Sequence, residues 1–122
     1  MTETRMLKIL IVDDEPIVRD VMGDFFEILG HAADGVENGL SGLRKLKEGP
    51  YDAVFTDIRM PGIDGIAFLK QAKALHPTLP IIVVTGHGSE ETEKEAMDAG
   101  ASGFINKPVG FSDIQRILEE IL

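Results

Sequence analysis

The sequence contains no cysteine among its 122 residues. Disulfides, thiolate metal sites and cysteine nucleophiles are therefore excluded. Long apolar runs are also lacking, because the strongest candidates, at 9–12 and 81–84, are far too short to span a membrane as a helix. Residues 1–8 show no apolar core of the kind that a secretory signal peptide requires. A cytosolic location is the simplest fit to these absences.

Basic residues are scarce: 12 lysines and arginines stand against 21 aspartates and glutamates, which gives a formal net charge of −9. This balance disfavours direct binding of nucleic acid by the domain, because most of its surface would repel phosphate. Solubility alone accounts for much of the acidity. Hydrophobic residues make up 43% and charged residues 27%, which is typical of a folded chain with room for one core.

A short apolar segment followed by an amphipathic one recurs along the chain. The apolar segments predict buried strands at 8–12, 31–34, 53–56, 80–85 and 103–106. Apolar residues at helical spacing predict helices at 18–29, 40–46, 68–75, 90–99 and 114–122. Gly30 should end the first helix, and Ser112 with Gln115 forms a candidate capping box for the last. Five such units predict an α/β fold with a parallel sheet, covered on both faces and joined by right-handed crossovers.

Polar residues gather where the predicted strands end. They are Asp13, Asp14 and Glu15 after the first strand, Asp57 after the third, Thr85 and Gly86 at the fourth, and Lys107 with Pro108 after the fifth. The first and third strands are neighbours in a doubly wound sheet, so carboxylates from distant positions should meet at one edge. Such a cluster needs an opposing charge, which Mg²⁺ or the Lys107 ammonium would supply. A carboxylate nucleophile, a hydroxyl donor, an ammonium and Mg²⁺ are the parts that phosphoryl transfer requires.

Each of these residues has a simpler interpretation when it is taken alone. Asp13 and Asp14 could cap the first helix, where carboxylates interact well with the helix dipole. Asp57 could be a loop residue and Thr85 a strand-end hydroxyl, and a Lys-Pro dipeptide carries little information. The coincidence of all of them at successive strand ends on one edge favours a functional site.

Several segments carry recognisable motifs in a fixed order. They are 9–15 (ILIVDDE), 57–62 (DIRMPG) with Asp64 and Gly65, 84–86 (VTG), 99–101 (AGA) and 104–108 (FINKP). With these segments the chain resembles the receiver domains of two-component response regulators, such as the chemotaxis regulators. The resemblance implies a single receiver domain over 1–122, with its core at about 7–122. It also implies a flavodoxin-like doubly wound (βα)5 fold, a three-layer sandwich whose parallel five-stranded sheet has the order 2-1-3-4-5.

The same resemblance implies roles for individual residues. Asp57 is the expected phosphoacceptor, and Lys107 should pair with the phosphoryl group. The peptide bond between Lys107 and Pro108 is expected to be cis. Mg²⁺ is the expected cofactor, and its expected ligands are Asp13, Asp14, Asp57 and the backbone carbonyl of Arg59.

Two further residues are implied to act as the switch. Thr85 should move toward the phosphoryl group, and Phe104 should turn into the space that it vacates, although an aromatic residue on a strand is also an ordinary core residue. Arg59 and His87 should influence the lifetime of the phosphoryl group, in a direction that the sequence does not give, and His87 could equally be an exposed loop residue. The acidic stretch 90–99 has few apolar residues, so we expect a weakly packed helix that switching displaces, or else a solvated surface helix.

The implied partner is a sensor histidine kinase or a histidine phosphotransfer domain, with an unknown output domain or target protein. The chain would then be a phosphoacceptor signalling domain rather than a metabolic enzyme. The alternatives are a docking module that is not phosphorylated, a flavin- or nucleotide-binding module, and a magnesium-dependent phosphatase. Gly86 and Gly88 lack the third glycine of a dinucleotide fingerprint, and 122 residues leave no space for a phosphatase cap.

Overall fold

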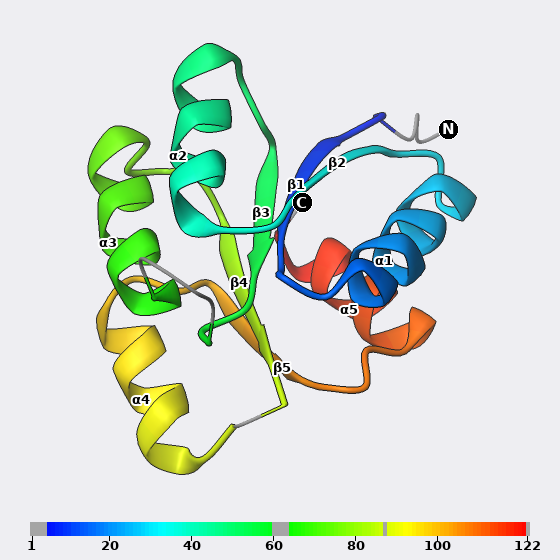
Figure 1. Ribbon diagram of the computed structural model, residues 1–122. Helices are drawn as coiled ribbons and strands as arrows, with labels where there is room; N and C mark the ends of the chain where they lie inside the picture. Colours follow the sequence, from blue (N-terminus) through cyan, green and yellow to red (C-terminus); the bar gives the residue numbers. More distant parts are fainter. Residues whose placement is uncertain (1–4, 60–63, 87, 122) are drawn as a thin grey trace.

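The computed structural model describes residues 5–59, 64–86 and 88–121. Strands and helices alternate along these ranges in five successive pairs, as the sequence predicted (Figure 1). The elements are β1 (Lys8–Val12), α1 (Pro16–Ile28), β2 (Ala32–Val36), α2 (Gly39–Glu48), β3 (Ala53–Thr56), α3 (Gly65–Leu75), β4 (Ile81–Thr85), α4 (Glu90–Asp98), β5 (Gly103–Asn106) and α5 (Phe111–Ile121). His87, residues 60–62 of the second motif and Leu122 lie outside the described residues.

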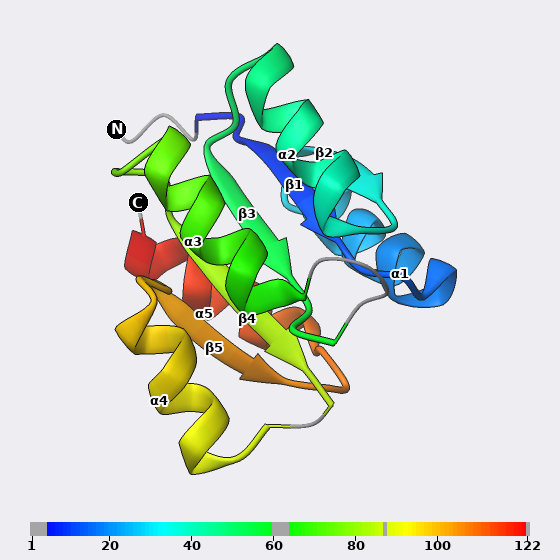
Figure 2. The same cartoon turned by 60° about the vertical axis from the view of Figure 1, so that its left-hand side comes forward.

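The strands form one parallel sheet in the order β2-β1-β3-β4-β5. Helices α1 and α5 cover one face of the sheet, and α2, α3 and α4 cover the other (Figures 1 and 2). This arrangement confirms the flavodoxin-like three-layer sandwich. The direction of strand order reverses between β1 and β3, and folds of this type bind ligands at the carboxyl ends of the strands near that point.

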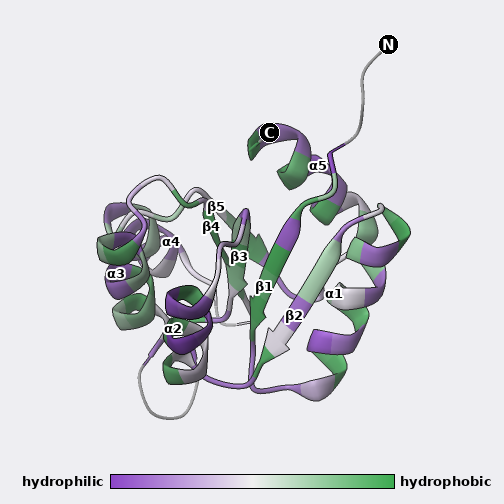
Figure 3. Ribbon diagram, turned by 90° about the horizontal axis from the view of Figure 1, so that it is seen from above, coloured by the Kyte–Doolittle hydropathy of each residue, from purple (hydrophilic) through white to green (hydrophobic). Residues whose placement is uncertain are grey.

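Both faces of the central strands are buried, which explains their continuous apolar sequences. In β1, for example, Leu10 and Val12 pack beneath α2 and α3, whereas Ile9 and Ile11 pack against the opposite layer. Figure 3 shows the resulting hydrophobic colouring along β1, with the edge strand β2 paler. Burial of their apolar side chains therefore holds β1, β3 and β4 in place relative to one another, and this sets where their carboxyl ends lie.

The ends of two helices show how local chemistry sets their bounds. Pro16 is the first residue of α1, a position where its missing N–H removes no helical hydrogen bond, so this helix begins before the predicted start at 18. Gly30 has a φ of +88° and ends the helix as predicted. The capping box predicted at Ser112 was wrong. Helix α5 begins at Phe111, and the Asp113 carboxylate instead accepts the N–H of Gly110 at 2.9 Å.

Helix α4 is the most weakly anchored of the helices in the described part of the chain. Ala96 is its one buried residue, and Met97 is 46% exposed. Ser89 caps the helix by accepting the N–H of Thr92, and Glu90 and Glu91 lie in the first turn. Local capping and the helix dipole therefore contribute more to α4 than burial does. No helix among the described residues has the length and apolar character needed to cross a bilayer.

Candidate functional site

The carboxyl ends of four strands bring the predicted polar residues to one edge of the sheet. Val12 of β1 lies opposite Thr56 of β3, so Asp13 and Asp57 follow at adjacent positions. Thr85 of β4 lies opposite Asn106 of β5, the residue before Lys107. The parallel register thus places side chains that are far apart in the sequence around one point.

Asp57 is buried, with 4% of its surface exposed, and its carboxylate is held from two sides. Its Oδ1 accepts the backbone N–H groups of Ile58 at 2.6 Å and Arg59 at 3.2 Å, and its Oδ2 accepts Lys107 Nζ at 2.8 Å. The loop after β3 is fixed in turn by α3, because the N–H of Gly65 donates to the carbonyl of Ile58 at 2.7 Å. Asp57 is therefore a preorganised carboxylate at the floor of the site.

Lys107 is the cation at the centre of the site. Its Nζ lies 2.8 Å from Asp57 Oδ2, 3.0 Å from Asp13 Oδ2 and 3.1 Å from Glu15 Oε1, and its side chain is only 14% exposed. Burial disfavours the ammonium, but the hydrogen bonds to these carboxylates outweigh it and raise the pKa of Lys107 above its ordinary value. The peptide bond from Lys107 to Pro108 is cis, as the family resemblance implied. The site therefore holds a fixed positive charge beside Asp57 at neutral pH.

Asp13 is the carboxylate of the site whose charged form burial disfavours. Burial raises its pKa, and the N–H of Glu15, which donates to Oδ1 at 2.9 Å, only partly offsets this effect. Its Oδ2 is buried and lies 3.0 Å from Lys107 Nζ, which is its one polar partner among the described residues. An additional cation at this oxygen would stabilise the charged form.

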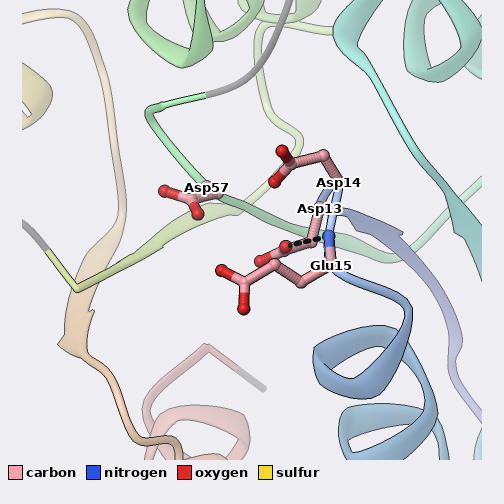
Figure 4. A group of neighbouring side chains, drawn as sticks. All are labelled: Asp13, Asp14, Glu15 and Asp57. Atoms are coloured by element: carbon pink, nitrogen blue, oxygen red, sulfur yellow. Dashed lines mark hydrogen bonds between the residues drawn. The ribbon is translucent and has the colours of Figure 1, made fainter.

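The carboxylates of the site fit a hard divalent cation. Asp13, Asp14, Glu15 and Asp57 each place an oxygen within 4.8 Å of the others, and Figure 4 shows the four side chains around a common space. Donors that are all oxygen suit Mg²⁺, which binds to one or two carboxylates and keeps several waters. Asp14 is exposed, so an ion at this position would remain open to water and to phosphoryl oxygens.

The remaining predicted residues lie around this centre. Thr85 is fully buried at the end of β4, and Phe104 is half-buried and packs against the hydrophobic cluster beneath α2, α3 and α4. Arg59 is exposed, with its backbone at the site through its hydrogen bond to Asp57. The contact between Glu15 and Lys107 was not predicted from the sequence. The position of Glu15 directly after Asp14 was the one feature of the sequence that pointed to it.

Comparison with known proteins identifies the family. Residues 9–119 match the family described as the response regulator receiver domain. The transcriptional regulatory protein ZraR of Escherichia coli (strain K12) is 34% identical over 116 residues, which cover 95% of this chain and 26% of ZraR. The chain therefore spans about a quarter of the length of this relative.

Solved structures agree with this assignment. The chemotaxis protein CheY4 of Vibrio cholerae has a TM-score of 0.90 and 26% identity, covering 97% of this chain and all of that one. The receiver domain of the sensor histidine kinase PA1611 of Pseudomonas aeruginosa PAO1, solved with a magnesium ion in its active-site cleft, has a TM-score of 0.86 and 27% identity, covering 95% and 97% of the two chains. With its fold, its strand-end residues and these matches, the chain belongs to the response regulator receiver domain family of two-component signalling.

Proposed function

We propose that Asp57 accepts a phosphoryl group from a phosphohistidine in a reaction that depends on Mg²⁺. The observation that carries this proposal is the buried Asp57 carboxylate, fixed by two backbone N–H groups and facing Lys107 at 2.8 Å beside an acidic cluster. A carboxylate in such a position can act as a nucleophile. The ammonium of Lys107 is already in place to stabilise the negative charge of the phosphoryl group that the carboxylate would receive.

The step is an in-line displacement at phosphorus. A carboxylate oxygen of Asp57 forms the new O–P bond while the N–P bond of the phosphoimidazole breaks, and the electron pair of that bond returns to the imidazole nitrogen. Lys107 would bind a phosphoryl oxygen in place of the Asp57 oxygen that it now contacts. Hydrolysis of the resulting acyl phosphate by water would restore Asp57 and release phosphate.

Asp13, Asp14, Asp57 and the backbone carbonyl of Arg59 are the groups that we propose hold Mg²⁺. The ion would neutralise charge on the phosphoryl oxygens. The buried Oδ2 of Asp13, which has Lys107 as its one polar partner among the described residues, supports its role as one of these ligands. Asp14 is exposed and would face the incoming group.

We propose that Thr85 and Phe104 transmit phosphorylation to the face formed by α4 and β5. Thr85 ends β4 opposite Asn106, the residue before Lys107, and Phe104 lies on the neighbouring strand β5. Gly88 follows Thr85 in the loop to α4, and a Cβ there would overlap the side chain of Asn106 and crowd Phe104. A displacement of Thr85 would therefore reach both Phe104 and the weakly anchored helix α4.

The proposed donor is a sensor histidine kinase or a histidine phosphotransfer domain in the cytoplasm. A groove of about 420 Å³ beside Lys107 is lined by apolar side chains of α1 and by Val109. Ile17, at its rim, is 76% exposed. A phosphohistidine can reach Asp57 only if its carrier covers the surface next to the site, so we propose that the donor docks on this groove. The output is a further domain or a separate target protein, and the chain acts as a signalling domain rather than as a metabolic enzyme.

Phosphorus NMR tests this proposal directly. With phosphoramidate as donor and Mg²⁺ present, the wild-type protein should show an acyl phosphate resonance that is absent from Asp57→Asn and from samples with excess chelator. An acyl phosphate signal that persists in Asp57→Asn would contradict the assignment of the acceptor. Absence of the signal from the wild type, together with failure to bind beryllium fluoride, would support a docking module that is not phosphorylated.

A further inference from the structure

Glu15 reaches the site from its rim rather than from its floor. It is the N-cap residue of α1, its side chain is 60% exposed, and its Oε1 lies 3.1 Å from Lys107 Nζ. Asp13 and Asp57, the other two carboxylates on this ammonium, are both buried. Glu15 is therefore the one exposed member of the three carboxylates that contact Lys107 in the described part of the chain.

The backbone of Glu15 is held in place by its neighbours. Pro16 follows it and restricts it to an extended conformation, which is observed at φ −91° and ψ 113°. Its N–H donates to Asp13 Oδ1 at 2.9 Å, and its carbonyl accepts the N–H of Arg19 at 3.2 Å. Because the backbone of Glu15 is held in place, its contact with Lys107 depends on the length of the Glu15 side chain.

The ammonium of Lys107 has three protons and faces three carboxylates. A phosphoryl group on Asp57 would accept a hydrogen bond from one of these N–H groups. A metal ion on Asp13 and Asp57 would draw those carboxylates away from Lys107. Glu15 is then the remaining competitor for the ammonium.

We infer that Glu15 is a positioning residue that holds Lys107 at the rim and weakens the hold of the site on the phosphoryl group. This inference rests on the proposed function, because it concerns the same Lys107 and the same anion. A contact at the exposed rim has a small effect, since an exposed ion pair changes an equilibrium constant by about five-fold at most. Glu15 would therefore weaken binding of the phosphoryl group by a small factor and would not abolish it.

Binding of beryllium fluoride, a phosphoryl mimic, to the full chain at saturating Mg²⁺ provides the test. Fluorine NMR would give the dissociation constant for the wild type, Glu15→Gln, Glu15→Asp and the control Glu27→Gln, which removes an exposed charge from the far end of α1. We expect Glu15→Gln to bind the mimic about two- to five-fold more tightly, the range that corresponds to an exposed ion pair. Glu15→Asp keeps the charge but is too short to reach Lys107, so it should also bind more tightly, and Glu27→Gln should match the wild type.

The outcomes separate the possible explanations. Equal or weaker binding by Glu15→Gln would overturn the inference while leaving the proposed function intact. Tighter binding by Glu15→Gln with wild-type affinity in Glu15→Asp would also overturn it, because charge alone, and not the hold on Lys107, would then be responsible. Failure of the wild type to bind the mimic would reject the proposed function, and the role of Glu15 with it.

Discussion

Gly65 lies where α3 comes closest to the loop that carries Asp57. A Cβ at this position would overlap the carbonyl oxygen of Asp57 and the Cα of Ile58. These are backbone atoms, which cannot rotate aside as a flexible side chain does. Gly65 therefore sets the distance between the helix and the proposed phosphoacceptor.

Replacing Gly65 by alanine should lower the free energy of unfolding by about 1–3 kcal/mol, the usual cost of overpacking. Urea denaturation would measure it. Gly23→Ala is the matched control, because a Cβ at Gly23 has no atom within 4 Å and alanine is the better helix former by about 0.5–1 kcal/mol. The control should be as stable as the wild type or more so, and unchanged stability in Gly65→Ala would contradict the close approach.

His31 is a second residue whose chemistry the fold constrains. It is 8% exposed, and its Nδ1 accepts the N–H of Leu7 at 3.0 Å, which requires an unprotonated Nδ1. Burial lowers the pKa of His31 below its ordinary value of about 6.5, against the opposing charge of Asp52. The unfolded chain then binds a proton at a higher pH than the folded chain does, so stability is lost as the pH falls below about 6.5.

The expected result is a free energy of unfolding that decreases between pH 7.5 and pH 5.5. His31→Asn should reduce this decrease, because its side-chain oxygen can accept the Leu7 N–H at either pH. His76→Asn is the control, since His76 is exposed and its Nε2 lies 3.0 Å from the carbonyl of Leu46. A pH dependence in His31→Asn identical to that of the wild type would rule out this role.

At the scale of elements, α4 differs from the helices that flank the sheet elsewhere. Ala96 is its single buried residue, whereas α1 buries Met22 and Phe26, and α5 buries Ile114 and Ile117. A helix with so little buried surface opens at low cost in free energy. This difference supports the proposal that phosphorylation displaces α4.

Amide hydrogen exchange measures this difference. The amides of α4 should exchange faster than those of α1 and α5 in the unphosphorylated protein, and beryllium fluoride with Mg²⁺ should change exchange in α4 more than in α1. Protection in α4 equal to that in α5, with no change on addition of the mimic, would identify α4 as an ordinary surface helix.

At the scale of the whole molecule, the proposed Mg²⁺ site at the acidic edge would link folding to metal binding. Three carboxylates contact one ammonium, and a fourth, on Asp14, lies beside them. An ion that binds only the folded chain stabilises it in proportion to the logarithm of its concentration. Thermal unfolding should therefore shift to higher temperature with added Mg²⁺. Asp13→Asn should lose this shift and be more stable than the wild type without the ion, since burial opposes the charge of Asp13.

The sequence predicted the architecture because the order of short apolar strands and amphipathic helices constrains an α/β sheet strongly. It also placed Asp13, Asp57, Thr85 and Lys107 at one edge, since the carboxyl ends of parallel strands meet there. The start of α5 was predicted wrongly, because Ser112 is itself a good capping residue, whereas in the structure the adjacent Asp113 accepts the N–H of Gly110 and the helix begins at Phe111. The contact between Glu15 and Lys107 joins residues 92 positions apart and depends on side-chain reach, which no local pattern encodes.

The central claim is that Asp57 is a phosphoacceptor dependent on Mg²⁺, and intact-protein mass spectrometry after incubation with acetyl phosphate tests it most directly. The wild type should gain one phosphoryl group when Mg²⁺ is present and none when it is chelated, and Asp57→Asn should gain none under either condition. Rapid hydrolysis is controlled by repeating the measurement at several early times. A phosphoryl group that appears without Mg²⁺, or that persists in Asp57→Asn, would contradict the account.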